Sequence, residues 1–190
     1  PILQDNVTQP AYYSYFLHGN VGGPINKNAS YFFSVFARNQ PDQSISEAID
    51  PASVTLNRSG NAVGTSINEA IANPGSRLDL SPRVDIQLGQ ANTLTIRYEY
   101  NRDVDTNGGL GTYSLPLQAV NTHDEENEIQ LSDSLVLSKN LVDDIRFRYQ
   151  RIRNQETPVS NLPSFGVQQT FTDGGANTQN IQDHENDYEV

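Results

Sequence analysis

The sequence contains no cysteine, methionine or tryptophan, and only two lysines among its 190 residues. Without cysteine there is no disulfide framework, no thiolate metal ligand and no cysteine nucleophile. Twelve basic residues stand against 23 acidic ones, and the resulting net charge of −11 is the opposite of a nucleic-acid-binding footprint. No apolar run approaches the roughly 18 residues of a membrane-spanning helix. Several common classes of protein are therefore excluded.

Neutral amides are abundant instead, with 20 Asn and 14 Gln beside 13 Gly and 10 Pro. Asn, Gly and Pro are poor helix formers and are depleted in strand interiors, so they favour turns and loops. The 9 Tyr and 7 Phe gather in short alternating segments, which argues against an intrinsically disordered chain. The composition predicts strands separated by polar loops.

The clearest strand pattern runs from Thr93 to Asn101, where apolar and polar residues alternate. A period of two places the two sets on opposite faces of a strand. A similar run covers 78–88, although Pro82 on its apolar face indicates an edge, a bulge or a kink. The short connector between the two runs predicts a hairpin over about 76–101.

The same arrangement predicts hairpins over about 11–38 and 127–153, each with a short turn. A seventh strand is expected to begin near Asp187. Only residues 44–52 have a tolerable helical composition, and Pro51 would limit a helix there. Long polar connections are predicted at about 39–75, 102–123 and 154–181.

Short and long connectors therefore alternate along the chain, which is typical of outer-membrane barrels and rare in soluble domains. The polar faces carry Arg, Asp, Glu, Gln, Asn and Ser, whereas both lysines fall in short turns. We predict an all-β chain, an antiparallel up-and-down meander of about six to seven strands. It would form one partial transmembrane β-barrel segment over residues 1–190. A soluble antiparallel β-sandwich with a binding or adhesion role shares the alternation and stays an alternative.

Several segments carry a family resemblance, beginning with GNVGGPINKNASYFF at 19–33. This segment resembles a hairpin of TonB-dependent outer-membrane receptors, of the type with a carboxypeptidase-regulatory-like N-terminal domain. Residues 77–85, 93–100 and 146–149 agree with that family in order. The resemblance implies a Gram-negative outer-membrane location, a barrel of about 22 strands around an internal plug, and import of a siderophore, oligosaccharide, peptide or similar ligand.

No plug domain and no box for the energy-coupling protein is recognisable in the sequence. The chain is therefore expected to be a stretch of barrel wall. Its implied partners are the lipid bilayer, the plug, the remaining strands and, through a missing N-terminal part, the TonB protein. No nucleic-acid partner is expected.

One stretch, Asp103 to Gly108, matches the first half of an EF-hand calcium loop. Asp103, Asp105 and Asn107 would supply oxygen ligands. The bidentate acid of the twelfth position is absent, because Ser114 stands there. The preferred interpretation is a polar turn in an exposed loop, so no metal site is assigned.

Two further clusters combine imidazole with carboxylates, at 123–126 and 183–185. Both are interpreted as solvated charge at loop–strand borders, and His18 as a polar-face residue beside Asn20. Four arginines, at 146, 148, 151 and 153, are interpreted as lumen lining together with a solvated rim. No Gly-x-Ser-x-Gly elbow or phosphate-cradling loop occurs. We therefore expect neither an enzyme nor a cofactor.

Overall fold

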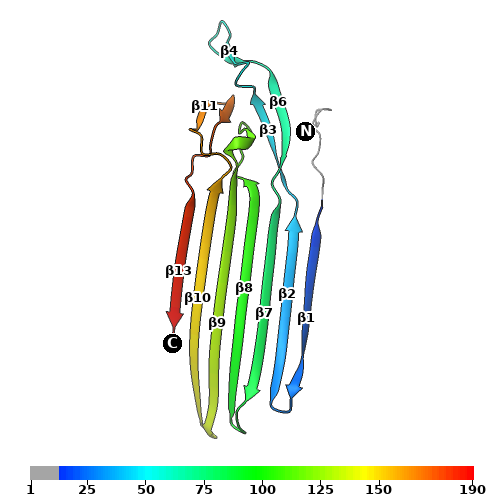
Figure 1. The fold of residues 1–190 in the computed structure, drawn as a ribbon, viewed down its shortest axis with the longest axis vertical. Coiled ribbons are helices and arrows are strands. Elements are labelled where there is room, and N and C mark those ends of the chain that lie inside the picture. The colour runs from blue at the N-terminus through cyan, green and yellow to red at the C-terminus, as the bar shows by residue number, and fades with distance from the viewer. Residues whose placement is uncertain (1–12) are drawn as a thin grey trace.

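Seven strands form one antiparallel sheet in the computed structural model, which describes residues 13–190 (Figure 1). The strand order is β1-β2-β7-β8-β9-β10-β13, so sheet neighbours follow one another along the chain once the insertions are set aside. The strands are β1 (Tyr15–Asn26), β2 (Ala29–Gln40), β7 (Gly75–Gln87), β8 (Asn92–Gly108), β9 (Val120–Ser138), β10 (Leu141–Pro158) and β13 (Ile181–Glu189). The predicted up-and-down meander is confirmed.

All three short turns lie at one rim, the lower one in Figure 1. β1 joins β2 through Lys27 and Asn28, and β9 joins β10 through Lys139 and Asn140. In the first turn the Asn28 backbone N–H donates to Asn26 Oδ1 at 2.8 Å, an Asx interaction that favours a tight reversal. Both lysines of the chain therefore mark this rim.

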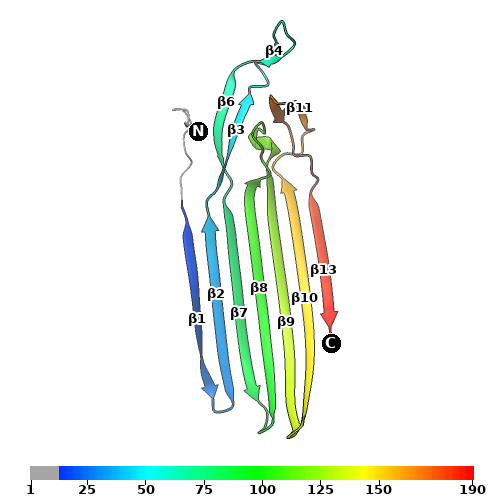
Figure 2. The same ribbon diagram turned by 180° about the vertical axis from the view of Figure 1, so that it is seen from behind.

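The long connections occupy the opposite rim and contain structure of their own (Figure 2). They contain β3 (Gln43–Ile49) paired with β6 (Ser66–Ala72), β4 (Thr55–Leu56) with β5 (Ala62–Val63), the 3₁₀ turn η1 (Pro116–Gln118), and β11 (Phe165–Val167) with β12 (Phe171–Asp173). The helix considered at 44–52 is wrong, because residues 43–49 form a strand that pairs with β6.

The strands are longer at this rim than the sequence predicts. β8 continues to Gly108, β9 begins at Val120, β10 ends at Pro158 and β13 begins at Ile181 rather than near Asp187. The predicted loops 102–123 and 154–181 therefore shrink to 109–119 and 159–180. Backbone pairing continues here although the apolar alternation has stopped.

The sheet is a single layer, since no second sheet packs on either face anywhere in residues 13–190. Among the described residues its strands hold no buried aliphatic or aromatic side chain, and their only buried apolar residue is Pro158, at the end of β10. The five buried aliphatic and aromatic side chains described are Ala48, Ile71, Leu115, Ala119 and Phe171, all in the long connections. The β-sandwich alternative is wrong, because a sandwich requires a second sheet over the apolar face.

No helix in the described part of the chain is long and apolar enough to cross a membrane.

Candidate functional site

The strand register sorts the side chains of the sheet into two faces. One rung runs through Tyr31, Val84, Ile96, Leu131 and Phe147 on five successive strands. Residues two positions away share this face, and the residues between them point to the other. We call the first the apolar face and the second the polar face.

The apolar face has no protein cover in the described chain. Leu137 is 56% exposed, Ile145 57% and Tyr98 37%, although all three lie on sheet strands flanked by other apolar side chains. A soluble protein rarely exposes so wide an apolar surface. This face requires an apolar surrounding.

Tyrosines mark where that surrounding ends. Tyr98, Tyr149 and Tyr188 follow one rung, with Ile129 between the first two. The Tyr98 hydroxyl donates to Asn127 Oδ1 at 2.6 Å, on the next rung toward the long connections. The Tyr149 hydroxyl donates to Asn186 on the same rung as Asn127, at 2.9 Å. Both rings thus lie on the apolar face, and their hydroxyl groups form hydrogen bonds on the side of the long connections, as expected at a membrane–water interface.

A family model described as "Outer membrane beta barrel domain" matches residues 51–189, more than half of the chain. The chain belongs to this family. It is an outer-membrane barrel protein, and the apolar face contacts lipid. Comparisons with curated proteins and with solved structures found no match. The tyrosine rung is the upper membrane boundary, called the tyrosine boundary below.

The polar face of this barrel wall is strongly acidic. Its sheet strands carry six arginines, namely Arg38, Arg77, Arg83, Arg97, Arg146 and Arg148. They also carry fourteen carboxylates, namely Asp79, Asp85, Glu99, Asp103, Asp105, Asp124, Glu126, Glu128, Asp144, Glu156, Asp183, Glu185, Asp187 and Glu189. Water in a barrel interior would solvate such a surface.

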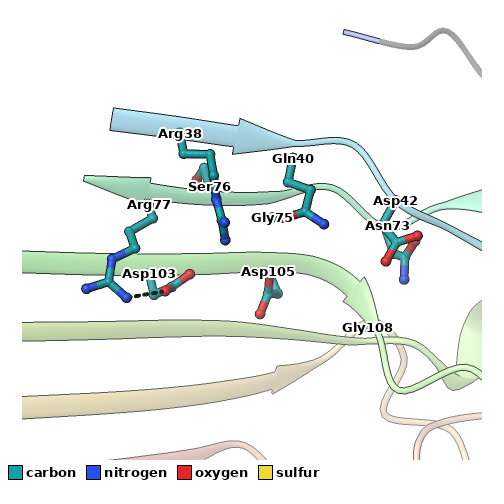
Figure 3. Close-up of a pocket in the computed structure, with 10 residues that line it drawn as sticks. All are labelled: Arg38, Gln40, Asp42, Asn73, Gly75, Ser76, Arg77, Asp103, Asp105 and Gly108. Atoms are coloured by element: carbon teal, nitrogen blue, oxygen red, sulfur yellow. Dashed lines mark ion pairs between the residues drawn. The ribbon is translucent and has the colours of Figure 1, made fainter. Parts of the chain in front are cut away.

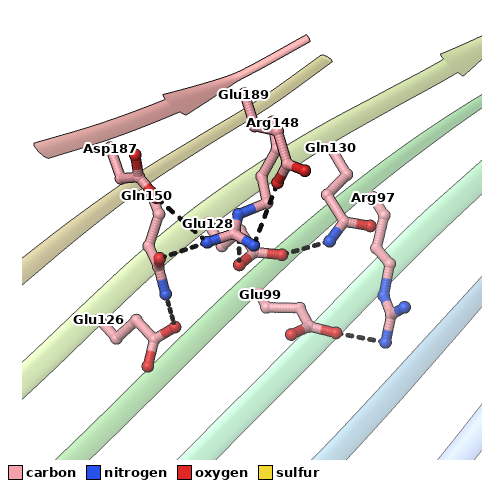
Figure 4. A network of polar contacts seen from close by, with 9 residues as sticks. All are labelled: Arg97, Glu99, Glu126, Glu128, Gln130, Arg148, Gln150, Asp187 and Glu189. Atoms are coloured by element: carbon pink, nitrogen blue, oxygen red, sulfur yellow. Dashed lines mark hydrogen bonds and ion pairs between the residues drawn. The ribbon is translucent and has the colours of Figure 1, made fainter. Parts of the chain in front are cut away.

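Arg148 lies at the centre of the densest cluster of these charges (Figure 4). Its guanidinium is 3.5 Å from each of three carboxylates, those of Glu128, Asp187 and Glu189. It also donates to Gln150 Oε1 at 2.7 Å. Glu128 is only 8% exposed, so the arginine supplies the charge that a buried carboxylate requires. One arginine among three carboxylates leaves this part of the wall negative.

A repeated pairing neutralises four of the other five polar-face arginines. Arg77 contacts Asp79 at 3.0 Å, Arg83 contacts Asp85 at 2.8 Å, and Arg146 contacts Asp144 at 2.7 Å. Arg97 pairs with Glu99 in the same way. Each pair is two residues apart on one strand, so both side chains lie on the polar face. The spacing is Arg-x-acid in three pairs and acid-x-Arg in the fourth, and it is a sequence signal for the polar face of a strand.

A polar pocket of about 310 Å³ opens where the sheet meets the β3–β6 hairpin (Figure 3). Arg38 and Arg77 approach it from β2 and β7, and Asp103 and Asp105 from β8. Arg77 is 3.9 Å from Asp103. Asn73 also lines the pocket, and its buried Oδ1 accepts no hydrogen bond from any described residue. The pocket therefore presents charges of both signs.

Asp105 depends on a glycine opposite. A Cβ on Gly75 would stand 2.5 Å from Asp105 Oδ1, so the missing side chain leaves room for the carboxylate. Partial burial, followed by the nearby charges of Asp103 and Asp124, raises the pKa of Asp105 above its ordinary value. A cationic group entering the pocket would relieve this cost.

The three residues of the calcium hypothesis do not form an EF-hand loop. Asp103 and Asp105 lie within strand β8, on the polar face, and Asp103 faces Arg77. Asn107 has a φ of 55° at the strand end, and its Nδ2 donates to the Ala72 carbonyl at 3.1 Å. The structure brings the two aspartates into one pocket but directs the Asn107 amide elsewhere. Among residues 13–190 no group of three or more His, Asp or Glu side chains is arranged to hold a metal ion.

The two histidine clusters also lie within strands rather than at loop borders. His123 is in β9 and His184 is in β13. Both point to the apolar-face side above the tyrosine boundary, while Asp124 and Asp183 point to the polar face. Alternation therefore separates each imidazole from the residue next to it, although Glu125 shares a face with His123 and lies 3.9 Å from it. His18 does lie on the polar face of β1.

The four arginines of β10 divide between the faces. Arg146 and Arg148 lie on the polar face, whereas Arg151 and Arg153 lie on the opposite face above the tyrosine boundary. This division agrees with the prediction of lumen-lining arginines followed by a solvated rim.

The three long connections pack together into a small cap. Ala48, Leu115 and Phe171 form its buried core, one from each connection. Backbone bonds join them: Glu47 N–H donates to the Thr112 carbonyl at 2.6 Å, Ile49 N–H to Thr170 at 3.0 Å, and Leu115 N–H to Thr172 at 2.9 Å. Gly174 turns the chain with a φ of 84°. A Cβ at this position would stand 2.1 Å from the Pro163 carbonyl oxygen, so only glycine fits. The cap places structured loops above the mouth of the polar face.

Proposed function

We propose that the chain is a wall segment of a TonB-dependent outer-membrane receptor that binds and imports a ligand. The observation that carries the proposal is the joined cap above a polar, lumen-facing wall with a pocket between them. A passive pore needs a water-filled interior but does not need three long connections built into a shared core. Surface loops held on a rigid scaffold are the usual location of ligand capture.

The two edges of the sheet that are unpaired in the described chain indicate that it is part of a larger barrel. Within residues 13–190, β1 and β13 each pair on one side only, and a membrane barrel cannot leave strand edges in lipid. Further strands must complete the wall. In the proposal these come from the same receptor, and a plug domain fills the interior and contacts the energy-coupling TonB protein.

The polar face suits a ligand held by many weak contacts. Arginine–carboxylate pairs along the strands leave carboxylate oxygens and amide groups free to accept and donate hydrogen bonds. A siderophore, an oligosaccharide or a peptide carries such groups. The proposal includes no catalytic step.

The plug is tested with paired photo-cross-linkers at Thr95 and Ile96, neighbours on β8 that face the lumen and the lipid respectively. The proposal expects Thr95 to cross-link to polypeptide and Ile96 to lipid. Cross-links to lipid from both positions, or to protein from neither, would refute a plugged lumen.

Import is tested separately in cells with and without TonB. Uptake of three labelled probes, a ferric siderophore, a maltodextrin and an oligopeptide, is measured while the barrel is expressed or deleted. The proposal expects one probe to accumulate only when both the barrel and TonB are present. Uptake that persists without TonB would identify a passive pore instead.

A further inference from the structure

Three arginines form an exposed basic patch on the outside of the barrel. Arg102 of β8 and Arg151 and Arg153 of β10 all lie on the apolar-face side of the sheet and are exposed. Within residues 13–190 none of the three has a carboxylate oxygen within 4.0 Å, whereas five of the six polar-face arginines do. The barrel therefore pairs most of its inward arginines with carboxylates and leaves these three outward ones unpaired within the described residues.

The register fixes the height of this patch. Arg151 lies one rung above Tyr149, and Arg153 two rungs above it. Arg102 lies one rung above Tyr100 on the neighbouring side of β9. One rung is about 7 Å along a strand, or about 5 Å in depth for a strand tilted by about 40°. The guanidinium groups thus begin directly above the tyrosine boundary, at the level of lipid headgroups.

Acidic and imidazole side chains also lie on this surface. Glu125 lies on the rung between Arg102 and Arg153, but its carboxylate accepts from Asn127 Nδ2 at 3.0 Å and faces His123 at 3.9 Å. His184 extends the same rung on β13. The patch keeps a positive excess in a chain whose net charge is −11.

We propose that this patch binds a phosphate-bearing lipid of the outer leaflet. Arginine matches phosphate with paired N–H donors, and its long stem lets the guanidinium reach headgroup depth while the methylenes lie against apolar surface. Charge complementarity and the height above the tyrosines select a lipid phosphate as the occupant. The inference rests on the membrane orientation of the apolar face and is independent of TonB coupling and of the imported ligand.

The test measures lipid binding to the barrel as extracted from the outer membrane. Barrels in phosphatidylcholine nanodiscs are titrated with labelled bisphosphorylated lipid A, and with the same lipid after enzymatic removal of its phosphates. The test variant combines Arg102→Gln, Arg151→Gln and Arg153→Gln. Its control, Lys27→Gln with Arg58→Gln and Lys139→Gln, removes the same charge from the short turns and the β4–β5 connection.

The test variant should bind bisphosphorylated lipid A about 100-fold more weakly, because each arginine near an anionic membrane surface contributes about a fivefold factor. The control variant should bind like the unchanged barrel, and the dephosphorylated lipid should bind both poorly. A triple Arg→Lys variant, which keeps the charge and the fold, should retain an intermediate affinity.

Three results would overturn the proposal. Equal losses in the test and control variants would show a general charge effect. Unchanged binding in the test variant would show that the arginines do not contact the lipid. Displacement of lipid A by inorganic phosphate at an equal concentration would show a site for the free anion.

Discussion

Replacing Ile96 by arginine, beside a matched Thr95→Arg variant, tests which face of the sheet contacts lipid. The two residues are neighbours on β8 and differ in face but hardly in depth. Ile96 lies among Val84 and Leu131 on the apolar face. Thr95 lies opposite Asp85 on the polar face and donates to its carboxylate at 2.7 Å.

The expected cost follows from depth. Ile96 is one rung below Tyr98, which places it about 5 Å inside the tyrosine boundary at a tilt of about 40°. Arginine on the lipid face costs about 2–4 kcal/mol at the midplane and about 0–1 kcal/mol near the interface. At this intermediate depth Ile96→Arg should therefore destabilise the barrel by about 1–2 kcal/mol. Thr95→Arg should cost less than about 1 kcal/mol, because the new guanidinium can pair with Asp85.

Both variants are measured by urea titration of the barrel assembled in phosphatidylcholine vesicles, followed by far-UV circular dichroism. Trypsin protection of the membrane-embedded strands provides an independent reading of assembly. If Thr95→Arg destabilised the barrel as much as Ile96→Arg, the assignment of the two faces would be wrong. If neither had an effect, the strand would not lie at membrane depth.

Three other substitutions test separate parts of the structure. Asp133→Leu should stabilise the barrel in vesicles by about 1–3 kcal/mol. Asp133 lies on the apolar face between Leu94 and Ile145, and its buried Oδ1 has no hydrogen-bond partner among the described residues. A loss of stability in urea titration would indicate a protein contact there. Asp105→Asn should raise the melting temperature at pH 7 and leave it unchanged at pH 3, because a raised folded-state pKa is a cost that appears only as pH rises through it; calorimetry showing the same gain at both values would exclude ionisation as the cause. Phe171→Ala should destabilise the cap by about 3–5 kcal/mol, because Phe171 is part of its buried core. Proteolysis at 159–180 should become faster while β7–β10 stay protected, and unchanged cleavage would refute the shared core.

The membrane-embedded part of the fold could be predicted from the sequence because lipid imposes an alternation on it. Leu94, Ile96 and Tyr98 point to lipid, and the residues between them point to water, so apolar and polar side chains alternate with a period of two. The three short turns could also be predicted, since Asn, Gly and Lys are concentrated there. The hairpins, their order and their pairing are confirmed for this reason.

The upper ends of the strands could not be predicted from the same pattern. Above the tyrosine boundary both faces of β9 meet water, and the run from Val120 to Glu128 is polar almost throughout. Backbone hydrogen bonds hold such a segment in the ladder without any alternation of hydrophobicity. A polar strand and a polar loop then have the same composition, and the loop bounds at 102–123 and 154–181 were misjudged accordingly.

The candidate site was visible only in fragments. The Arg-x-acid pairs, such as Arg83 with Asp85, require only that a strand be recognised, so sequence reasoning could have found them. The pocket could not be found in this way, because it joins Arg38, Asn73 and Asp105 from segments that only the register brings together. The cap likewise depends on contacts between connections far apart along the chain, for which no local signal exists.

The extension of the strands above the bilayer changes where ligand capture begins. Nine residues of β9 lie above Ile129, which at about 3.3 Å each and a tilt of about 40° amounts to roughly 20–25 Å of wall outside the membrane. The pocket lies in this extension, and the cap is built on its end. A connection anchored on paired strands has less conformational freedom to lose on binding than one that starts at the membrane surface. The protruding ladder, more than the composition of the loops, is therefore what would let these long connections act as one preformed surface.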